Sequence, residues 1–352
     1  MVACRGPQGG LGAQLADDAA GHRATRTVAT VQGPKHIEER MMRVNRDFGA
    51  LNPNSVGTLM KEAVRRAIVA IRAQRFTFET RAKNPSDSSR GLDFVTTADH
   101  AAQQVLVSLL RAWFPDYGIV AEEDHLRVPC THPHHDVWFT VDPLDGTRAF
   151  MRRQSHGIGT MVSLVCDGDV IAACVGDVMT SEVYAARPDD YTVHRISEFG
   201  IAERLTVDTT RPLSEQGVLI GDHGRPRSPI IVAMVADPEP LFAGIQTASG
   251  SIGIGIARLW KSEVGGAVFG PFALGSPWDL YPIIGISRRL GFHFFALPLE
   301  GPGFPWQPTI DRRGTPVPHE ILVLHESRLP ELESWTHMAF GEVGTIRASP
   351  PS

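Results

Sequence analysis

The sequence predicts a layered α/β protein, and two observations carry that prediction. The first half contains an antiparallel hairpin, in which the apolar runs 160–165 and 170–175 flank the turn Asp167-Gly168-Asp169. In the second half, strand and helix patterns alternate. They fall at 218–221 (strand), 251–264 (helix) and 267–269 (strand). Helices that alternate with strands cover the faces of a sheet, so we expect stacked layers of both.

The chain opens with a segment that we expect to be disordered. Residues 1–45 mix Ala, Gly, Thr and Arg without sustained hydrophobic periodicity. A helix follows, because apolar residues then recur at helical spacing. They are Leu59, Met60, Ala63, Val64, Ala67, Ile68 and Ile71. We divide the remaining chain into an N-terminal α+β half (53–205), a C-terminal α/β half (206–342) and a tail (343–352).

Acidic residues follow two short apolar segments of the first half. The segment 94–98 leads to Asp99, which we expect to cap a helix. That helix carries Val105, Leu106, Leu109, Leu110 and Trp113. A short strand at 118–121 ends in the pair Glu122-Glu123. Each of these acids alone is also compatible with a helix cap or a solvated loop.

The most informative stretch is Asp142-Pro143-Leu144-Asp145-Gly146-Thr147, which follows the buried-strand pattern 138–141. Its two carboxylates lie on one tight turn, where they repel each other unless a cation lies between them. Gly146 permits the turn, and Thr147 presents a hydroxyl and N–H groups where a helix can begin. This stretch therefore predicts a cation beside an anion pocket.

Two other interpretations of the same stretch stand beside that one. Phosphatases of the haloacid dehalogenase class also carry an Asp-rich signature ending in Asp-Gly-Thr, but one residue separates their two Asp, whereas two residues stand between Asp142 and Asp145. This spacing disfavours an aspartyl-phosphate mechanism. The remaining alternative is purely structural: an Asp-Pro turn with a second Asp that caps a helix. A further acid, Asp279, stands at the head of a helix pattern (280–290) that leads into a strand at 292–297.

Taken in order, these acids resemble the inositol monophosphatase family, part of the lithium-sensitive, metal-dependent phosphatase superfamily. The resemblance runs from about Val56 to about Trp335. It implies a five-layer αβαβα sandwich and a homodimer. Because Asp279 would have to reach Asp142 and Asp145, the active site would lie between the two halves.

The resemblance also implies a role for each acid. Glu122, Asp142 and the backbone carbonyl of Leu144 would bind one metal ion. Asp142, Asp145 and Asp279 would hold a second. The resemblance implies two or three metal ions, and we expect Mg²⁺ because the ligands are all oxygen atoms. Glu122 and the pair formed by Asp99 and Thr147 would position and activate the attacking water.

Five residues are expected to contact the phosphate or the substrate. The N–H groups of Gly146 and Thr147 would hold the phosphate. Lys83 stands where the family has a basic residue on a mobile loop, here 84–91. Ser251 begins the helix of the second half, and Arg148 opens the basic stretch that ends at Arg153.

The substrate is less defined than the reaction. Inositol phosphatases carry a Glu seven residues before the Trp-Asp acid, where this chain has Phe272, and nucleotide-type relatives carry a Lys that 251–255 lacks. We predict a magnesium-dependent phosphomonoesterase that acts on a small phosphorylated polyol or sugar. The alternatives are a 3'(2'),5'-bisphosphate nucleotidase or a histidinol-phosphate phosphatase, and, from another class, a catalytically idle regulatory subunit.

Composition excludes several classes of protein. The 352 residues carry 34 Lys and Arg against 39 Asp and Glu, so the net charge of −5 does not suit a nucleic-acid polymer as partner. The four cysteines form no Cys-x-x-Cys pair, and no apolar run is long enough to cross a membrane. We expect a cytoplasmic protein. The stretch 130–136, with three His and one Cys, suits no standard zinc spacing, so we expect an exposed loop without an ion.

Overall fold

The computed structural model describes residues 48, 51–83, 94–221, 228–270, 276–299, 303–314, 317 and 319–344, with backbone only for 342–344. The predicted extension (1–45), Phe272, the predicted loop 84–91 and most of the predicted tail lie outside the described residues.

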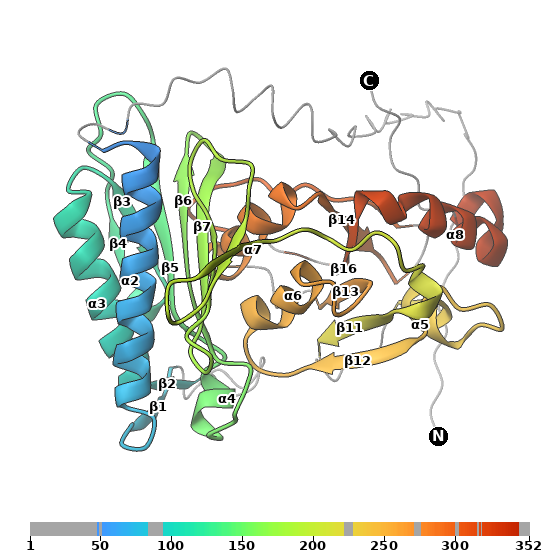
Figure 1. Cartoon of the computed structure of the whole chain (residues 1–352), viewed down its shortest axis with the longest axis horizontal. Helices are drawn as coiled ribbons and strands as arrows, with labels where there is room; N and C mark the ends of the chain where they lie inside the picture. Colours follow the sequence, from blue (N-terminus) through green and yellow to red (C-terminus); the bar gives the residue numbers. More distant parts are fainter. Residues whose placement is uncertain are drawn as a thin grey trace, which may run out of the picture.

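Five layers are stacked in the order helix, sheet, helix, sheet, helix (Figure 1). Helices α2 (Pro53–Ala73) and α3 (Thr97–Trp113) cover the outer face of the first sheet. Helices α6 (Ile252–Trp260) and α7 (Pro277–Arg289) lie between the two sheets. The outer face of the second sheet is covered by α5 (Pro229–Ala236) and α8 (Leu329–Gly344). The predicted αβαβα sandwich is confirmed.

The first sheet has eight strands in the order β10-β9-β8-β7-β6-β5-β3-β4 among the described residues. Neighbours are antiparallel except for β3 and β5, which run parallel. The predicted hairpin is the pair β6 and β7. The strands are β3 (Gly118–Ala121), β4 (Arg127–Val128), β5 (Val137–Asp145), β6 (Gly159–Cys166), β7 (Asp169–Asp177), β8 (Val183–Ala186), β9 (His194–Ile196) and β10 (Ala202–Arg204).

The second sheet has six strands in the order β12-β11-β13-β16-β14-β15 within the described part of the chain. The first three are parallel to one another, and the rest pair antiparallel. The strands are β11 (Gly217–Gly221), β12 (Gly244–Ala248), β13 (Gly266–Phe269), β14 (Phe292–Leu297), β15 (Phe304–Pro305) and β16 (Glu320–His325). A separate two-stranded sheet joins β1 (Thr80–Ala82) and β2 (Phe94–Thr96).

Short elements complete the chain. They are α4 (Thr147–Met151) and the 3₁₀ turns η1 (Glu123–His125), η2 (Leu213–Glu215) and η3 (Glu326–Arg328).

Local sequence explains where the first helices begin. The side chain of Asn52 caps α2 by accepting a hydrogen bond from the Ser55 N–H, and Pro53 follows at the first helical position, where its fixed φ suits the helix. Thr96 caps α3, while Asp99 accepts a hydrogen bond from the Thr96 N–H. The expectation that Asp99 itself is the cap is therefore wrong: it is the acidic partner in a capping box that begins at Thr96.

Two other sequence expectations need correction. The predicted helix 251–264 ends earlier, at Trp260, because a turn with Ser262 at positive φ precedes β13. The strands β1, β4, β8, β9, β10, β12, β15 and β16 were not predicted. Most of them are short or lie at a sheet edge, where hydrophobic alternation is weak.

Candidate active site

The acids of the first half meet at one edge of the first sheet. Because β3 and β5 are parallel, their carboxyl ends lie side by side, and the Glu122 N–H donates to the Val141 carbonyl at 3.1 Å. The expectation that Asp142 and Asp145 lie on a turn after the strand is wrong, because β5 continues to Asp145; its pairing with β6 shifts in register between these two residues, and such an irregularity bends the strand there. Both acids are buried, with 1% and 7% of their surfaces exposed.

Helix α7 adds the acid of the second half. Asp279 lies in its first turn and is half-buried, and its carboxylate lies close enough to Asp142, Asp145 and Glu122 for their charges to interact. Burial, followed by the negative charges of neighbouring carboxylates, raises the pKa of Asp142 and of Asp279 well above the usual range. This concentration of buried negative charge fits a divalent cation with oxygen ligands, as Mg²⁺ prefers.

Asp145 is held by the N-terminus of α6. The Ser251 hydroxyl and the Gly253 N–H donate to its Oδ2, the latter at 2.8 Å, and the Ile252 N–H donates to Oδ1 at 3.1 Å. Burial raises the pKa of Asp145, although these three hydrogen bonds oppose the rise. Ser251, predicted as a phosphate or substrate contact, is itself buried and orients Asp145 here. Its contact with a ligand stays a prediction.

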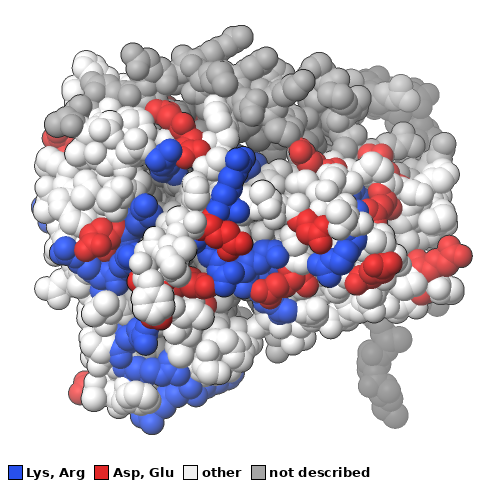
Figure 2. Space-filling view, viewed as in Figure 1, with Lys and Arg blue, Asp and Glu red and all other residues white. Residues whose placement is uncertain are grey.

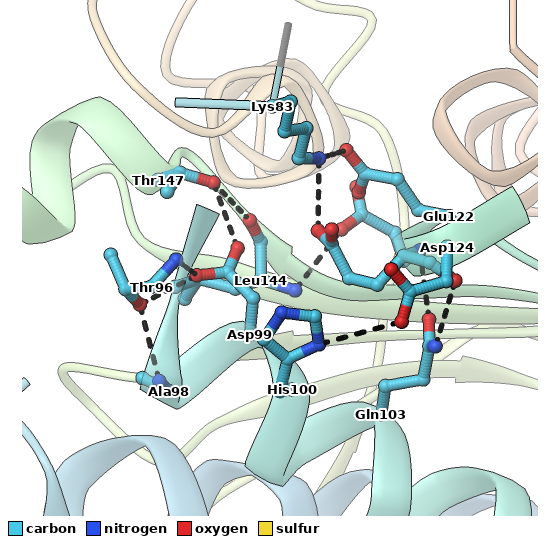
Figure 3. A network of polar contacts seen from close by, with 12 residues as sticks. Lys83, Thr96, Ala98, Asp99, His100, Gln103, Glu122, Asp124, Leu144 and Thr147 are labelled. Carbon is cyan, nitrogen blue, oxygen red and sulfur yellow. Dashed lines mark hydrogen bonds and ion pairs between the residues drawn. The ribbon is translucent and has the colours of Figure 1, made fainter. Parts of the chain in front are cut away.

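Asp99 and Thr147 form the predicted pair (Figure 3). The Thr147 hydroxyl lies 3.0 Å from Asp99 Oδ1 and 3.2 Å from the Leu144 carbonyl oxygen. Asp99 Oδ2 accepts hydrogen bonds from the N–H and the hydroxyl of Thr96, at 2.8 and 2.6 Å. The carboxylate is thus fixed from both sides, and Thr96 is a positioning residue that sequence reasoning missed, although the spacing Thr-x-x-Asp is that of a capping box.

Burial raises the pKa of Asp99 to about 6, so its ionisation opposes folding. The unfolded chain ionises this carboxyl near its ordinary value of about 3.9, so stability falls as pH rises through the folded pKa. With a chelator present, the free energy of unfolding of Asp99→Asn should increase relative to that of the wild type by about 3 kcal/mol as the pH rises from 4 to 8. Urea unfolding of both proteins across this range measures the gain. Two parallel stability curves would contradict the assignment.

Lys83 is bound by the acidic pair. Its Nζ lies 2.6 Å from Glu122 Oε1 and 2.9 Å from Glu123 Oε1, as Figure 3 shows for Glu122. Burial lowers the pKa of Lys83, but the charges of both glutamates outweigh it and raise the pKa above its usual range. Because Lys83 occupies Glu122 Oε1, that oxygen has to exchange Lys83 for an ion before it can act as a ligand.

Glu123 was not among the predicted site residues, yet it is 2% exposed and burial raises its pKa to about 8. The buried amide of Gln103 clamps its backbone, donating to the Glu123 carbonyl at 3.0 Å and accepting from its N–H at 2.9 Å. No signal in the sequence separates Glu123 from Glu122, because adjacent residues differ only in the direction that the fold gives them.

Three of the predicted phosphate or substrate contacts lie next to one another in the chain. Gly146 and Thr147 lie at the start of α4, where Gly146 adopts φ +92°. Arg148 follows in the same helix and is exposed. Glu122, Asp142, Asp145, Asp279 and the pair Asp99–Thr147 thus converge on one region, with Lys83 bound to it.

The comparison with protein families agrees with this geometry. Residues 54–219 match the model of the inositol monophosphatase family. Over these residues, the chain resembles the inositol monophosphatase family. The match covers all predicted site residues of the first half, whereas Ser251 and Asp279 lie beyond it.

Curated relatives share part of the family sequence with this chain. The Nus factor SuhB of Xylella fastidiosa is 29% identical over 119 residues, which are 34% of this chain and 41% of that protein. Inositol monophosphatase 2 of Rattus norvegicus is 36% identical over 75 residues, 21% of this chain and 26% of its own. The chain thus spans less than half the length of these two relatives.

Solved structures of the family share the fold. An IMPase/NADP phosphatase complexed with Mg²⁺ and phosphate matches with a TM-score of 0.59 and 17% identity, over 80% of this chain and 96% of that one. The similarity of fold therefore extends through the second half of this chain. None of the described helices is long and apolar enough to cross a membrane.

Proposed function

We propose that the protein is a magnesium-dependent phosphomonoesterase that acts on a small phosphorylated polyol or sugar. The observation that carries the proposal is the convergence of Asp142, Asp279 and Glu122 beside the hydrogen-bonded pair Asp99–Thr147. A scaffold that only binds partners gains nothing from a buried acidic cluster, because each buried charge opposes folding.

The donor set suits Mg²⁺, which would be held by Glu122, Asp142, the Leu144 carbonyl, Asp145 and Asp279. Bound Mg²⁺ would neutralise the phosphate oxygens and lower the pKa of a coordinated water. The chain's own groups then do the remaining work. Asp99 Oδ1 accepts a hydrogen bond from the Thr147 hydroxyl. This hydrogen bond leaves the lone pairs of the hydroxyl oxygen free to accept a hydrogen bond from the attacking water. The hydrogen bonds from the Ile252 and Gly253 N–H groups at the start of α6 fix the orientation of the Asp145 carboxylate.

Surface charge supports an anionic substrate. Figure 2 shows Lys and Arg side chains gathered at the lower end of the molecule, the end where Figure 1 places α4. In and just after α4, Arg148, Arg152 and Arg153 are exposed. Because α4 begins with Thr147, these cations lie within or just after the helix whose N-terminus would bind the phosphate. Their positive charge raises the local concentration of anions.

Phosphate release tests the proposal. The purified chain is incubated with Mg²⁺, with and without lithium, and with inositol phosphate, fructose bisphosphate, histidinol phosphate or adenosine 3',5'-bisphosphate. We expect one monoester to be preferred and its hydrolysis to require Mg²⁺. A preference for the bisphosphate nucleotide or for histidinol phosphate would select the alternative substrates on the same site. Absence of release from every substrate would contradict the proposed activity.

The curated relatives named Nus factor SuhB favour a second candidate function. On this proposal the chain acts as a regulatory partner and the acidic cluster is retained without turnover. The same assay separates the two, because a regulatory partner would bind Mg²⁺ without releasing phosphate from any substrate.

A further inference from the structure

A second cluster of metal-ligating side chains lies at the opposite end of β5 from the candidate active site. His135 stands just before β5, and Cys166 and Asp167 form the end of β6 and the turn that follows. Strand β5 spans nine residues, which places this cluster about 25 Å from Asp145. The cluster is therefore separate from the acids of the phosphatase site.

The three side chains present one nitrogen, one sulfur and one oxygen to a common point. Their ligand atoms all lie within 4.8 Å of one another. His135 Nδ1 is 2.7 Å from Asp167 Oδ2, and Cys166 Sγ is 3.6 Å from the same oxygen. In a tetrahedral zinc site, ligand atoms stand about 3.3 to 3.7 Å apart. The sulfur already fits that spacing, and the nitrogen and oxygen need to separate by about 0.6 Å.

The backbone holds these ligands in place before any ion binds. Asp167 begins the hairpin turn with φ +50°, a conformation that Asp tolerates better than most residues. Its N–H donates to the Asp136 carbonyl at 3.0 Å, and its Oδ1 accepts from the Asp136 N–H at 2.9 Å. These two bonds tie the turn to the loop that carries His135, so little further ordering is needed to form a site.

Burial gives the cluster an inner and an outer side. Cys166 is 3% exposed, whereas the side chains of His135 and Asp167 are 18% and 47% exposed. The neighbouring ring of His132 stacks on that of His135, with the ring centres 5.6 Å apart. A cation thus reaches the cluster from the Asp167 side, with the sulfur behind it.

We propose that His135, Cys166 and Asp167 form a second metal site, which binds a zinc-type ion with solvent in the fourth position. A thiolate and an imidazole select zinc over magnesium, and the carboxylate completes a mixed nitrogen, oxygen and sulfur set. On binding, the Cys166 thiol releases its proton to solvent, and neutral His135 takes the tautomer with its proton on Nε2, so that Nδ1 is free to bind the ion. The ion would fasten the loop before β5 to the β6–β7 hairpin.

Cobalt titration of the full chain tests this site without relying on catalysis. Co²⁺ bound by a thiolate gives a sulfur-to-metal charge-transfer band, which oxygen ligands at the phosphatase site do not produce. We expect a saturable band that added Zn²⁺ removes. The band should be lost in Cys166→Ser, and the affinity should fall at least about 10- to 100-fold in His135→Ala and in Asp167→Asn, since loss of a direct ligand costs at least as much as loss of a residue that only orients one.

Matched variants keep the result unambiguous. Cys174→Ser removes a buried thiol from the adjacent strand β7, and Asp142→Asn alters the phosphatase site; both should keep the band. His135→Ala changes a partly exposed loop residue, so it reports on the site even if Cys166→Ser fails to fold. A wild-type chain without the band, or a folded Cys166→Ser with the full band, would overturn the proposal. A band lost only in Cys130→Ser would place the thiolate ligand elsewhere and overturn it as well.

Discussion

Asp142→Asn should lower phosphate release at least about 100-fold and, in the same protein, stabilise the metal-free fold. Asp142 is 1% exposed and lies within the range of charge interaction with Glu122, Asp145 and Asp279. Its amide analogue keeps the shape of the side chain but loses the charge that would hold Mg²⁺. The loss of turnover follows from the weaker ligand set.

The expected gain in stability also results from removing the negative charge of Asp142. Burial and the charges of Glu122, Asp145 and Asp279 raise the pKa of Asp142, so its ionised form opposes folding as pH increases. Removing it should stabilise the metal-free chain at pH 8 by on the order of 1–3 kcal/mol. Added Mg²⁺ should raise the stability of the wild type more than that of the variant.

Turnover with Mg²⁺ and urea unfolding with a chelator measure the two effects. Asp116→Asn is the control, because Asp116 is exposed and its side chain contacts only Thr131 among the described hydrogen bonds. We expect it to change neither quantity. A variant of Asp142 that turns over normally would remove this residue from the metal site, and one that is destabilised without metal would show that charge repulsion is not the dominant effect.

Gly146→Ala should be strongly destabilising, at about 3 kcal/mol or more. Gly146 adopts φ +92°, and an added Cβ would lie 2.4 Å from the Gly157 carbonyl oxygen and 2.6 Å from the Ser251 nitrogen. Both are backbone atoms whose neighbours are fixed by the hydrogen bond from Ser251 N to Gly157 O at 2.8 Å. The contact joins the turn after β5 to the start of α6, so the substitution also displaces the clamp on Asp145.

Gly200→Ala separates steric overlap from backbone strain. Gly200 adopts a similar φ of +82°, but no atom lies within 4 Å of the position of an added Cβ. It should therefore cost only the strain, about 1–2 kcal/mol. Urea unfolding of both variants gives the difference directly. Equal losses would mean that the backbone around Gly146 yields to the methyl group.

The sequence predicted the acids well because each follows a strong local signal. The apolar strand pattern before Asp142 and the helix pattern after Asp279 are formed by neighbouring residues, and both elements are present. The αβαβα architecture came from family resemblance, since alternation of elements shows layers but not their number. Local patterns were weakest where strands are short or at an edge, as in β12 and β15.

Partners distant in the chain could not be predicted in this way. Lys83 meets Glu122 across 39 positions, and Ser251 meets Asp145 across 106. The spacing within the stretch 130–136 argued against a metal, but His135 finds its co-ligands 31 and 32 positions later, in the β6–β7 turn.

By itself, then, the sequence determined which residues could carry charge to the site, because hydrophobic periodicity sets where a strand or helix ends and which acid follows it. Tertiary structure decided what each acid contacts. The parallel pairing of β3 with β5 brings Glu122 beside Asp142, and the packing of α7 against the first sheet adds Asp279. The physical reason is that charge repulsion and burial depend on distances through space, which close packing of layers sets and sequence separation does not.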